Sequence, residues 1–274
     1  MTKKILIILV LATIAFAACN GGKEKNGYEL VWSDDFGPDT NTSKTMPDTT
    51  KWWYETGGGG WGNNELQTYV KGIAEGDTLA YISDGTLKIK AVKLTTPIDN
   101  HKYASIRINS KASWKYGYIE ARLKTVKGYG TWPAFWMLPE DFKNWPIDGE
   151  IDIMEHAGNV PDSIHITVHT QKHNHSNNTQ ISSISYVPGS QNKFHTYGIE
   201  WNENYIKGYI DGQCKYTFEN DGRNDKETWP FDKPFYLKLN LALGGFFSNQ
   251  VTVDEAALPA IYEIDYVRVY QKKQ

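Results

Sequence analysis

Short β-rich runs separated by turn residues recur along almost the whole chain, and this regularity limits the possible fold more than any other feature. β-branched and aromatic residues are frequent in these runs, and no long stretch has the 3.6-residue period of a helix. Many regularly spaced strands with almost no helix favour an antiparallel β-sandwich of jelly-roll type. The clearest runs are residues 86–94, 104–109, 116–126, 150–155, 164–170 and 235–243.

Two further segments suggest how strands pair. Residues 196–218 read as a three-strand meander, with turns at 202–204 and at Asp211-Gly212. Asp-Gly between alternating runs is a strong hairpin signal. The last run, residues 262–271, alternates in hydrophobicity and is predicted to pair with residues 29–36. No linker-like break separates these segments, so we expect one domain over residues 28–271.

The N-terminus reads as a targeting segment. Two lysines precede a short apolar run, which is typical of a signal peptide. Ala17 and Ala18 before Cys19 resemble a bacterial lipobox, although Phe16 stands where Leu is usual. We expect a lipoprotein signal peptide over residues 1–18, lipidation of Cys19 and a polar, Gly-rich tether over 19–27. An ordinary secretory signal is the alternative.

The composition of the chain limits the kinds of partner that it can bind. The 274-residue chain has a formal net charge of -3 and no basic cluster, so we expect no nucleic-acid partner. Ten Trp and seventeen Tyr raise the expectation of a surface that stacks on rings. There are two cysteines. If Cys19 carries lipid, Cys214 has no partner, and we expect it to be a buried structural thiol.

One predicted strand carries three carboxylates. In DGEIDIMEHAG, residues 148–158, Glu150 and Asp152 share a face because strand side chains alternate with period 2. Glu155 is out of phase. A solvated acidic face is the simple interpretation of such a pattern. Three acids on a strand of a Trp-rich sheet would nevertheless repel one another unless a cation or substrate gave them a purpose.

A β-bulge would resolve the phase. One extra residue at Ile153–Met154 resets the alternation and returns Glu155 to the face of Glu150 and Asp152. The two glutamate carboxyls could then approach to about 5–6 Å, near the separation of a retaining glycosidase's nucleophile and acid/base. Asp152 would lie between them, orienting the nucleophile. The residues alone do not say which glutamate has which role.

This strand resembles the active-site strand of glycoside hydrolase family 16, in the bulged form of laminarinases, the endo-β-1,3-glucanases. The similarity spans about residues 28–271 and includes WGNNELQTY (61–69), TWPAFWMLP (131–139), FHTYGIEW (194–201) and PFYLKLNLALGG (234–245). It implies an all-β, concanavalin A-like antiparallel jelly-roll sandwich with a concave substrate cleft. It also implies that Glu150 is the nucleophile, Asp152 the assisting acid and Glu155 the acid/base.

Other residues are candidate substrate contacts. Each candidate also has a structural alternative. The tryptophans could pack in the core, the asparagine could cap a turn, and the arginine could form an ion pair within the sheet. The resemblance places His169 near the acid/base. A departure is the string GGFFSN (244–249), where laminarinases often have an aromatic and a further Gly-rich loop. The candidates are Asn64, Glu65, Arg107, Trp132, Trp136, Trp145 and His169.

No catalytic cofactor is expected. His165 and His169 share a strand face about 13 Å apart at ~3.3 Å per residue, which is too far for one zinc ion. The resemblance does suggest a structural Ca2+ away from the cleft, held by oxygens of Asp35, Gly85 and Asp265. Asp35 replaces the commoner Glu, and solvated acids at strand ends are the alternative.

The leading hypothesis is a lipid-anchored, monomeric, retaining endo-β-1,3-glucanase of the bacterial outer membrane, at the cell surface or the periplasmic face. Its substrate would be laminarin and, by extension, mixed-linkage β-1,3/1,4-glucan. A relative acting on galactan-type algal polysaccharide is a second hypothesis, and the absence of a strongly basic loop argues against sulfate binding. A noncatalytic glucan-binding surface lipoprotein is a third, and the presence of both glutamates argues against it.

Overall fold

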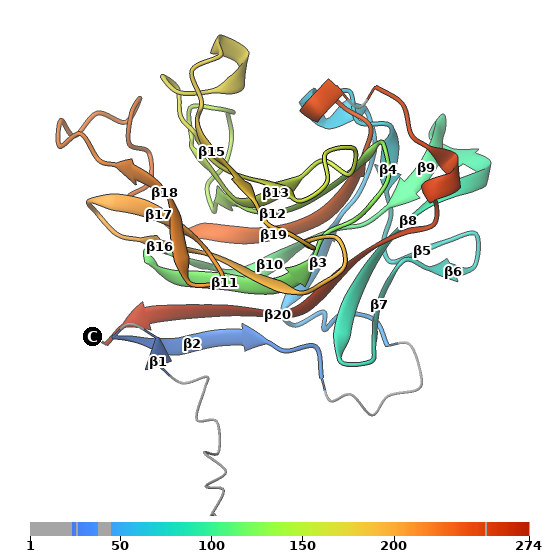
Figure 1. The fold of residues 1–274 in the computed structure, drawn as a ribbon, viewed down its shortest axis with the longest axis horizontal. Helices are drawn as coiled ribbons and strands as arrows, with labels where there is room; N and C mark the ends of the chain where they lie inside the picture. Colours follow the sequence, from blue (N-terminus) through green and yellow to red (C-terminus); the bar gives the residue numbers. More distant parts are fainter. Residues whose placement is uncertain (1–23, 26, 38–44, 250, 274) are drawn as a thin grey trace, which may run out of the picture.

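The recurring β-rich runs form strands, and the strands make two large sheets that stack on each other (Figure 1). The structure is a computed structural model that describes residues 24–25, 27–37, 45–249 and 251–273. Within these ranges the helical segments are short 3-10 turns: η1 (Gly60–Gly62), η2 (His175–Asn177), η3 (Phe247–Asn249) and η4 (Glu255–Ala257). The expected all-β sandwich is therefore confirmed.

The larger sheet has 11 strands, in the order β18-β17-β16-β11-β20-β8-β9-β4, with β1, β2 and β7 joined to it beside this path. Its pairs are antiparallel except for β4 with β9. The bounds are β1 (Glu24–Lys25), β2 (Tyr28–Asp34), β4 (Gln67–Tyr69), β7 (Ala80–Ser83), β8 (Thr86–Ile98), β9 (His101–Ser105), β11 (Gly117–Lys124), β16 (His195–Trp201), β17 (Tyr205–Ile210), β18 (Gln213–Glu219) and β20 (Ala260–Lys272).

The second sheet has 7 strands in the order β15-β14-β13-β12-β19-β10-β3. A separate two-stranded ribbon joins β5 (Ile73–Ala74) to β6 (Asp77–Thr78). The bounds of the second sheet are β3 (Trp52–Glu55), β10 (Arg107–Trp114), β12 (Thr131–Pro139), β13 (Glu150–His156), β14 (Ser163–His169), β15 (Ile181–Tyr186) and β19 (Phe235–Leu243).

A single hydrophobic core lies between the two sheets. Alternate residues of each strand point into it, such as Leu87 and Ile119 from the larger sheet and Phe135 and Leu239 from the second. These four side chains have 0% exposure. Burying a side chain of this size stabilises the fold by about 1.5–3 kcal/mol. The core fixes one face of the second sheet, so the polar residues of its strands are presented on the other face.

One predicted run divides between the sheets. Residues 104–109 read as one strand, yet β9 ends at Ser105 and β10 begins at Arg107. β9 pairs with β8 of the larger sheet, whereas β10 pairs with β19 and β3 of the second. Ile106 between them is fully buried. The chain crosses from one sheet to the other at this residue, which hydrophobic alternation cannot reveal.

The terminal pairing is confirmed, because β2 pairs antiparallel with the last part of β20, from Val267 to Lys272. The first part of β20 pairs with β8. The alternation of β20 is less clean than expected. Tyr262 and Ile264 face the core, and then Val267 and Val269 do. The register against β11 shifts at this point, so β20 contains a bulge at Asp265.

The described end of the predicted tether is partly ordered. Glu24–Lys25 form β1, which pairs with β2, and the ammonium of Lys25 contacts Glu120. Residues 1–18 and Cys19 lie outside the described residues. In the part of the chain that the structure describes, no helix has the length and apolar character needed to cross a membrane.

The predicted meander is confirmed as β16, β17 and β18. The expectation that Cys214 is a buried thiol is wrong. Its side chain is exposed, not buried. Tyr216 and Phe218 face inward, and simple alternation would put Cys214 on their side, but the register against β17 shifts between Tyr216 and Cys214 and leaves Lys215 as an extra residue. This bulge turns Cys214 to the other face.

Candidate active site

A bulge in β13 places the three carboxylates on one face. Met154 pairs with Phe135 of β12 and Asp152 pairs with the next residue, Trp136, so Ile153 has no counterpart on β12. The register against β14 also shifts between Asp152 and Glu155. Both Ile153 and Met154 are buried in the core. Two consecutive core residues return Glu155 to the cleft face, at the predicted position of the bulge.

The carboxylates line a cleft of about 490 Å³ on the outer face of the second sheet. This volume is in the range of ligand sites. Residues of η1 and η2 are part of its lining. The lining comprises Glu55, Trp61, Gly62, Asn63, Glu65, Arg107, Trp132, Ala134, Trp136, Leu138, Phe142, Trp145, Glu150, Asp152, Glu155, His175, Ser176, Lys238, Asn240 and Ala242.

His169 is buried beside Glu150 and is not among the residues that line the cleft. It is the cross-strand partner of Glu150, and its Nε2 lies 3.9 Å from Glu150 Oε1 and 3.3 Å from Asp152 Oδ2. His165 is the residue directly opposite Glu155. His169 is nevertheless near enough to Glu155 to lower the pKa of that carboxyl electrostatically.

Glu150 and Asp152 form a coupled pair joined by a side-chain hydrogen bond. Burial and then the neighbouring Asp152 raise the pKa of Glu150, and burial raises the pKa of Asp152 to about 8. A pair of this kind holds one proton at neutral pH. Glu150 is the more exposed of the two, with 16% side-chain exposure against 4%. Exposure to water favours the ionised form of a carboxyl, so the greater exposure of Glu150 favours a negative charge there and opposes the effect of burial.

Glu155 has a different environment. Its Oε1 accepts a hydrogen bond of 2.9 Å from Nε1–H of Trp132. Burial, followed by the charge of Asp152, raises the pKa of Glu155 to about 8, although the Trp132 bond opposes this shift. Glu155 is thus protonated at neutral pH and can act as an acid.

The three predicted cleft tryptophans all line the cleft. Trp132 stacks on Phe247 with ring centroids 4.9 Å apart, and Trp136 donates to Asn240 Oδ1 at 2.6 Å. Trp145 lies against His175, with centroids 4.5 Å apart. Their contact with sugar stays a prediction. Phe247 belongs to the GGFFSN string, which was expected to border the cleft. His175 was not expected here, because its loop takes a course that depends on the folded sheet.

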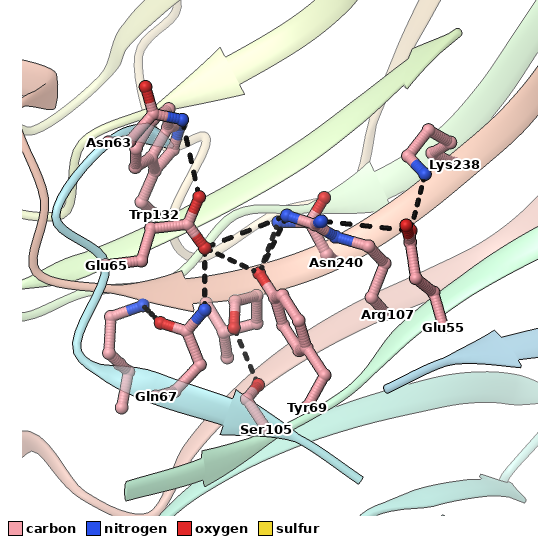
Figure 2. Close-up of polar contacts among 12 residues, drawn as sticks. Glu55, Asn63, Glu65, Gln67, Tyr69, Ser105, Arg107, Trp132, Lys238 and Asn240 are labelled. Atoms are coloured by element: carbon pink, nitrogen blue, oxygen red, sulfur yellow. Dashed lines mark hydrogen bonds and ion pairs between the residues drawn. The ribbon is translucent and has the colours of Figure 1, made fainter. Parts of the chain in front are cut away.

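Arg107 is buried beneath the cleft floor, and Figure 2 shows it between two acids. It lies 3.8 Å from Glu55 and 3.7 Å from Glu65, and donates to Tyr69 Oη at 3.3 Å. This is the ion pair within the sheet that the sequence left open. A hydrogen bond from Arg107 to a sugar stays a prediction.

Glu65 is held by neighbouring donors. It accepts from Gln67 at 2.6 Å and from Tyr69 at 3.1 Å, and these bonds are drawn in Figure 2. Asn63, which lines the cleft, donates to Glu65 at 3.4 Å. Asn64 differs from expectation. It is exposed in a turn with φ 57°, outside the cleft lining, because the left-handed turn directs its predecessor inward.

Lys238 and Asn240 are cleft residues that the sequence interpretation missed. Lys238 is 1% exposed, and its Nζ lies 2.6 Å from Glu55 and 4.9 Å from the Trp136 ring centroid. The signal was present in FYLKLNLAL, where polar residues stand at even spacing in an apolar strand. That spacing puts both on one face.

The calcium prediction stays a prediction. Asp35 lies 2.9 Å from Arg268, and Asp265 contacts Arg122. A calcium ion needs several oxygens and would have to displace these arginines. Within the described chain, one group offers three side-chain ligand atoms within 4.8 Å of one another, from Glu150, Asp152 and His169. Glu150 and Asp152 of this group line the cleft, whereas His169 does not.

Comparison with known proteins agrees with this site. The sequence profile of glycosyl hydrolases family 16 matches residues 67–268, and the chain belongs to this family. A Rhodothermus marinus protein named beta-glucanase is 40% identical over 281 residues, which is 99% of this chain and 95% of the relative.

Two solved structures are also similar. The laminarinase of Rhodothermus marinus has a TM-score of 0.82 and 42% identity, over 90% of this chain and 98% of the other. SCLam, described as a non-specific endo-beta-1,3(4)-glucanase, has a TM-score of 0.82 and 41% identity, over 91% and 93%.

Proposed function

We propose that this protein is a retaining endo-β-1,3-glucanase that also cleaves mixed-linkage β-1,3/1,4-glucan. The observation that carries the proposal is the β13 bulge, which presents Glu150, Asp152 and Glu155 together on the cleft face. The laminarinase and the endo-β-1,3(4)-glucanase among the similar structures support the substrate class.

In the first step, Glu150 attacks the anomeric carbon while Glu155 protonates the glycosidic oxygen that leaves. A carboxylate–sugar ester forms as the glycosidic bond breaks. In the second step, Glu155 removes a proton from water, which attacks the same carbon and releases Glu150. Asp152 donates its hydrogen bond to Glu150 and keeps the nucleophile oriented. Two inversions restore the original configuration.

The charge balance of the cleft supports a neutral polysaccharide. The two cations that line the described cleft, Arg107 and Lys238, both face Glu55. The charge of each cation is therefore already compensated by a carboxylate. A sulfate group favours clusters of Arg and Lys whose charge is free to bind it. A sulfated galactan is therefore the less favoured substrate. A purely binding role is also less favoured, because a glucan-binding surface has no need of buried acids with raised pKa values.

Digestion of three polysaccharides tests the substrate class. We expect oligosaccharides from laminarin and lichenan, because one cleft accommodates both neutral glucans, and none from agarose. Products are identified by chromatography and mass spectrometry. Release of oligosaccharides from agarose with intact laminarin would contradict the proposal, and binding of laminarin without any products would favour the noncatalytic alternative.

We also propose that Cys19, which lies outside the described residues, carries a lipid that anchors the protein in the bacterial outer membrane. Lipobox-like Ala17, Ala18 and Cys19 support this. We expect Cys19→Ser to move the protein from the membrane fraction to the soluble fraction with specific activity on laminarin unchanged, because the anchor and the cleft are separate. Cell fractionation with immunoblotting measures this, with Cys214→Ser as control. Cys19→Ser protein that stays in membranes would exclude the lipid.

A further inference from the structure

The loop that follows β19 packs directly on Trp132. A Cβ added to Gly245 would lie only 3.1 Å from Cζ3 of the Trp132 ring, and Gly245 has φ +95°. The ring of Phe247 stacks on the same tryptophan, with an interplanar angle of 13°. The absence of a side chain at Gly245 and the flat ring of Phe247 together define where the indole can lie.

This loop is itself fixed at several points. The Gly244 N–H donates to Gly130 O at 2.7 Å, and the Phe246 N–H donates to Asn63 O at 2.8 Å. Figure 1 accordingly places η3 beside η1. His165 meets the Phe247 ring edge-on, with centroids 4.9 Å apart. Phe247 is thus held between the loop and β14, while the Phe246 side chain is 59% exposed.

The opposite end of Trp132 reaches the proposed acid/base through its 2.9 Å hydrogen bond to Glu155 Oε1. We infer that Phe247 is a positioning residue for Glu155: it clamps Trp132, and the clamped indole N–H orients the carboxyl for proton transfer. The inference rests on the proposed role of Glu155, and it gives a function to the GGFFSN string that departs from the family pattern.

The Trp132 bond assists proton transfer because negative charge develops on Glu155 during the reaction. When Glu155 protonates the leaving oxygen, it becomes a carboxylate, and a hydrogen bond to an ionised acceptor is roughly twice as strong as a neutral one. The Trp132 bond therefore strengthens along the reaction and lowers its barrier. It also holds Oε1, which leaves Oε2 for the glycosidic oxygen. Without Phe247 the indole could shift, and both effects would weaken. A small displacement of the N–H misaligns the Glu155 carboxyl with the glycosidic oxygen.

Phe247→Ala tests the inference, with Phe246→Ala as a matched control of the same chemistry one residue away. We expect Phe247→Ala to lower kcat on laminarin about tenfold, a part of the 10²–10⁴-fold that general acid catalysis supplies. KM should change little. On dinitrophenyl β-laminaribioside we measure kcat/KM, which reports the first step only, and the leaving group needs no proton there, so we expect a loss of about twofold or less. Phe246→Ala should stay within about twofold on both substrates.

A Trp132→Phe background separates positioning from general damage, because this change removes the N–H donor and keeps a ring. There, Phe247→Ala should cause about twofold or less further loss on laminarin, so the two changes are not additive. Equal losses on both substrates, full additivity or a change confined to KM would overturn the inference. Thermal melting monitors folding, and Phe247→Leu replaces Phe247→Ala if the latter does not fold. Wild-type hydrolysis of laminarin tests the proposed function separately.

Discussion

We expect Glu150→Ala to lower kcat on laminarin by about 10⁴-fold or more, because no other group can form the bond to the anomeric carbon. Added azide or formate should partly restore cleavage of dinitrophenyl β-laminaribioside. The small anion enters the space of the missing carboxylate and attacks once, so the azide product is the α-anomer. Reducing-sugar release and NMR of the azide adduct measure these outcomes.

Glu219→Ala is the control for Glu150→Ala. Glu219 is an exposed carboxylate on β18, at the far edge of the other sheet. Its removal should leave kcat within about twofold, as most surface substitutions do little. A Glu150→Ala enzyme with more than a tenth of wild-type activity would remove Glu150 from the mechanism.

Glu155→Ala should have the second largest effect, and it should depend on the leaving group. We expect kcat/KM to fall about 10³-fold on laminarin, whose leaving sugar must be protonated, and about tenfold or less on dinitrophenyl β-laminaribioside. This ratio reports the first step and is independent of the later step in which Glu155 is the base. Azide should give a β-glycosyl azide of retained configuration, because Glu150 still forms the ester. Equal losses on both substrates would argue that Glu155 acts in structure and not as the acid.

The same substitution should change the pH profile. Burial raises the pKa of Glu155 to about 8, so its acid form is present below this pH and is lost above it. Wild-type kcat/KM on laminarin should therefore fall as pH rises through about 8, and Glu155→Ala should lack that alkaline limb on the aryl substrate. A limb that persists in Glu155→Ala would assign the titration to another group, such as the Glu150–Asp152 pair.

Local pattern was sufficient for much of the fold and for the centre of the site. The number of β-rich runs predicted the sandwich, and the phase of Glu155 predicted the β13 bulge at Ile153–Met154. Both arguments depend on side-chain alternation within one strand. A bulge is visible in a sequence only when it moves a residue of recognisable chemistry to an unexpected face. The bulge at Asp265 in β20 had no such marker.

The remaining features depend on contacts between distant parts of the chain. Lys238 pairs with Glu55, 183 positions away, and only the order of strands in the sheet brings them together. The pairing of His169 with Glu150 is set by the register of β14 on β13. The exposure of Cys214 follows from the register shift between β17 and β18, which leaves Lys215 as an extra residue. Sequence pattern carries little information on any of these.

The configuration of the first product tests the central claim most directly. NMR of a laminari-oligosaccharide digest, recorded before mutarotation, reports the anomer that the enzyme releases. If Glu150 and Glu155 act as nucleophile and acid/base on one face of β13, the new reducing end appears first as the β-anomer and then equilibrates. Initial release of the α-anomer would mean single-step inversion by water, and would contradict the paired-glutamate mechanism.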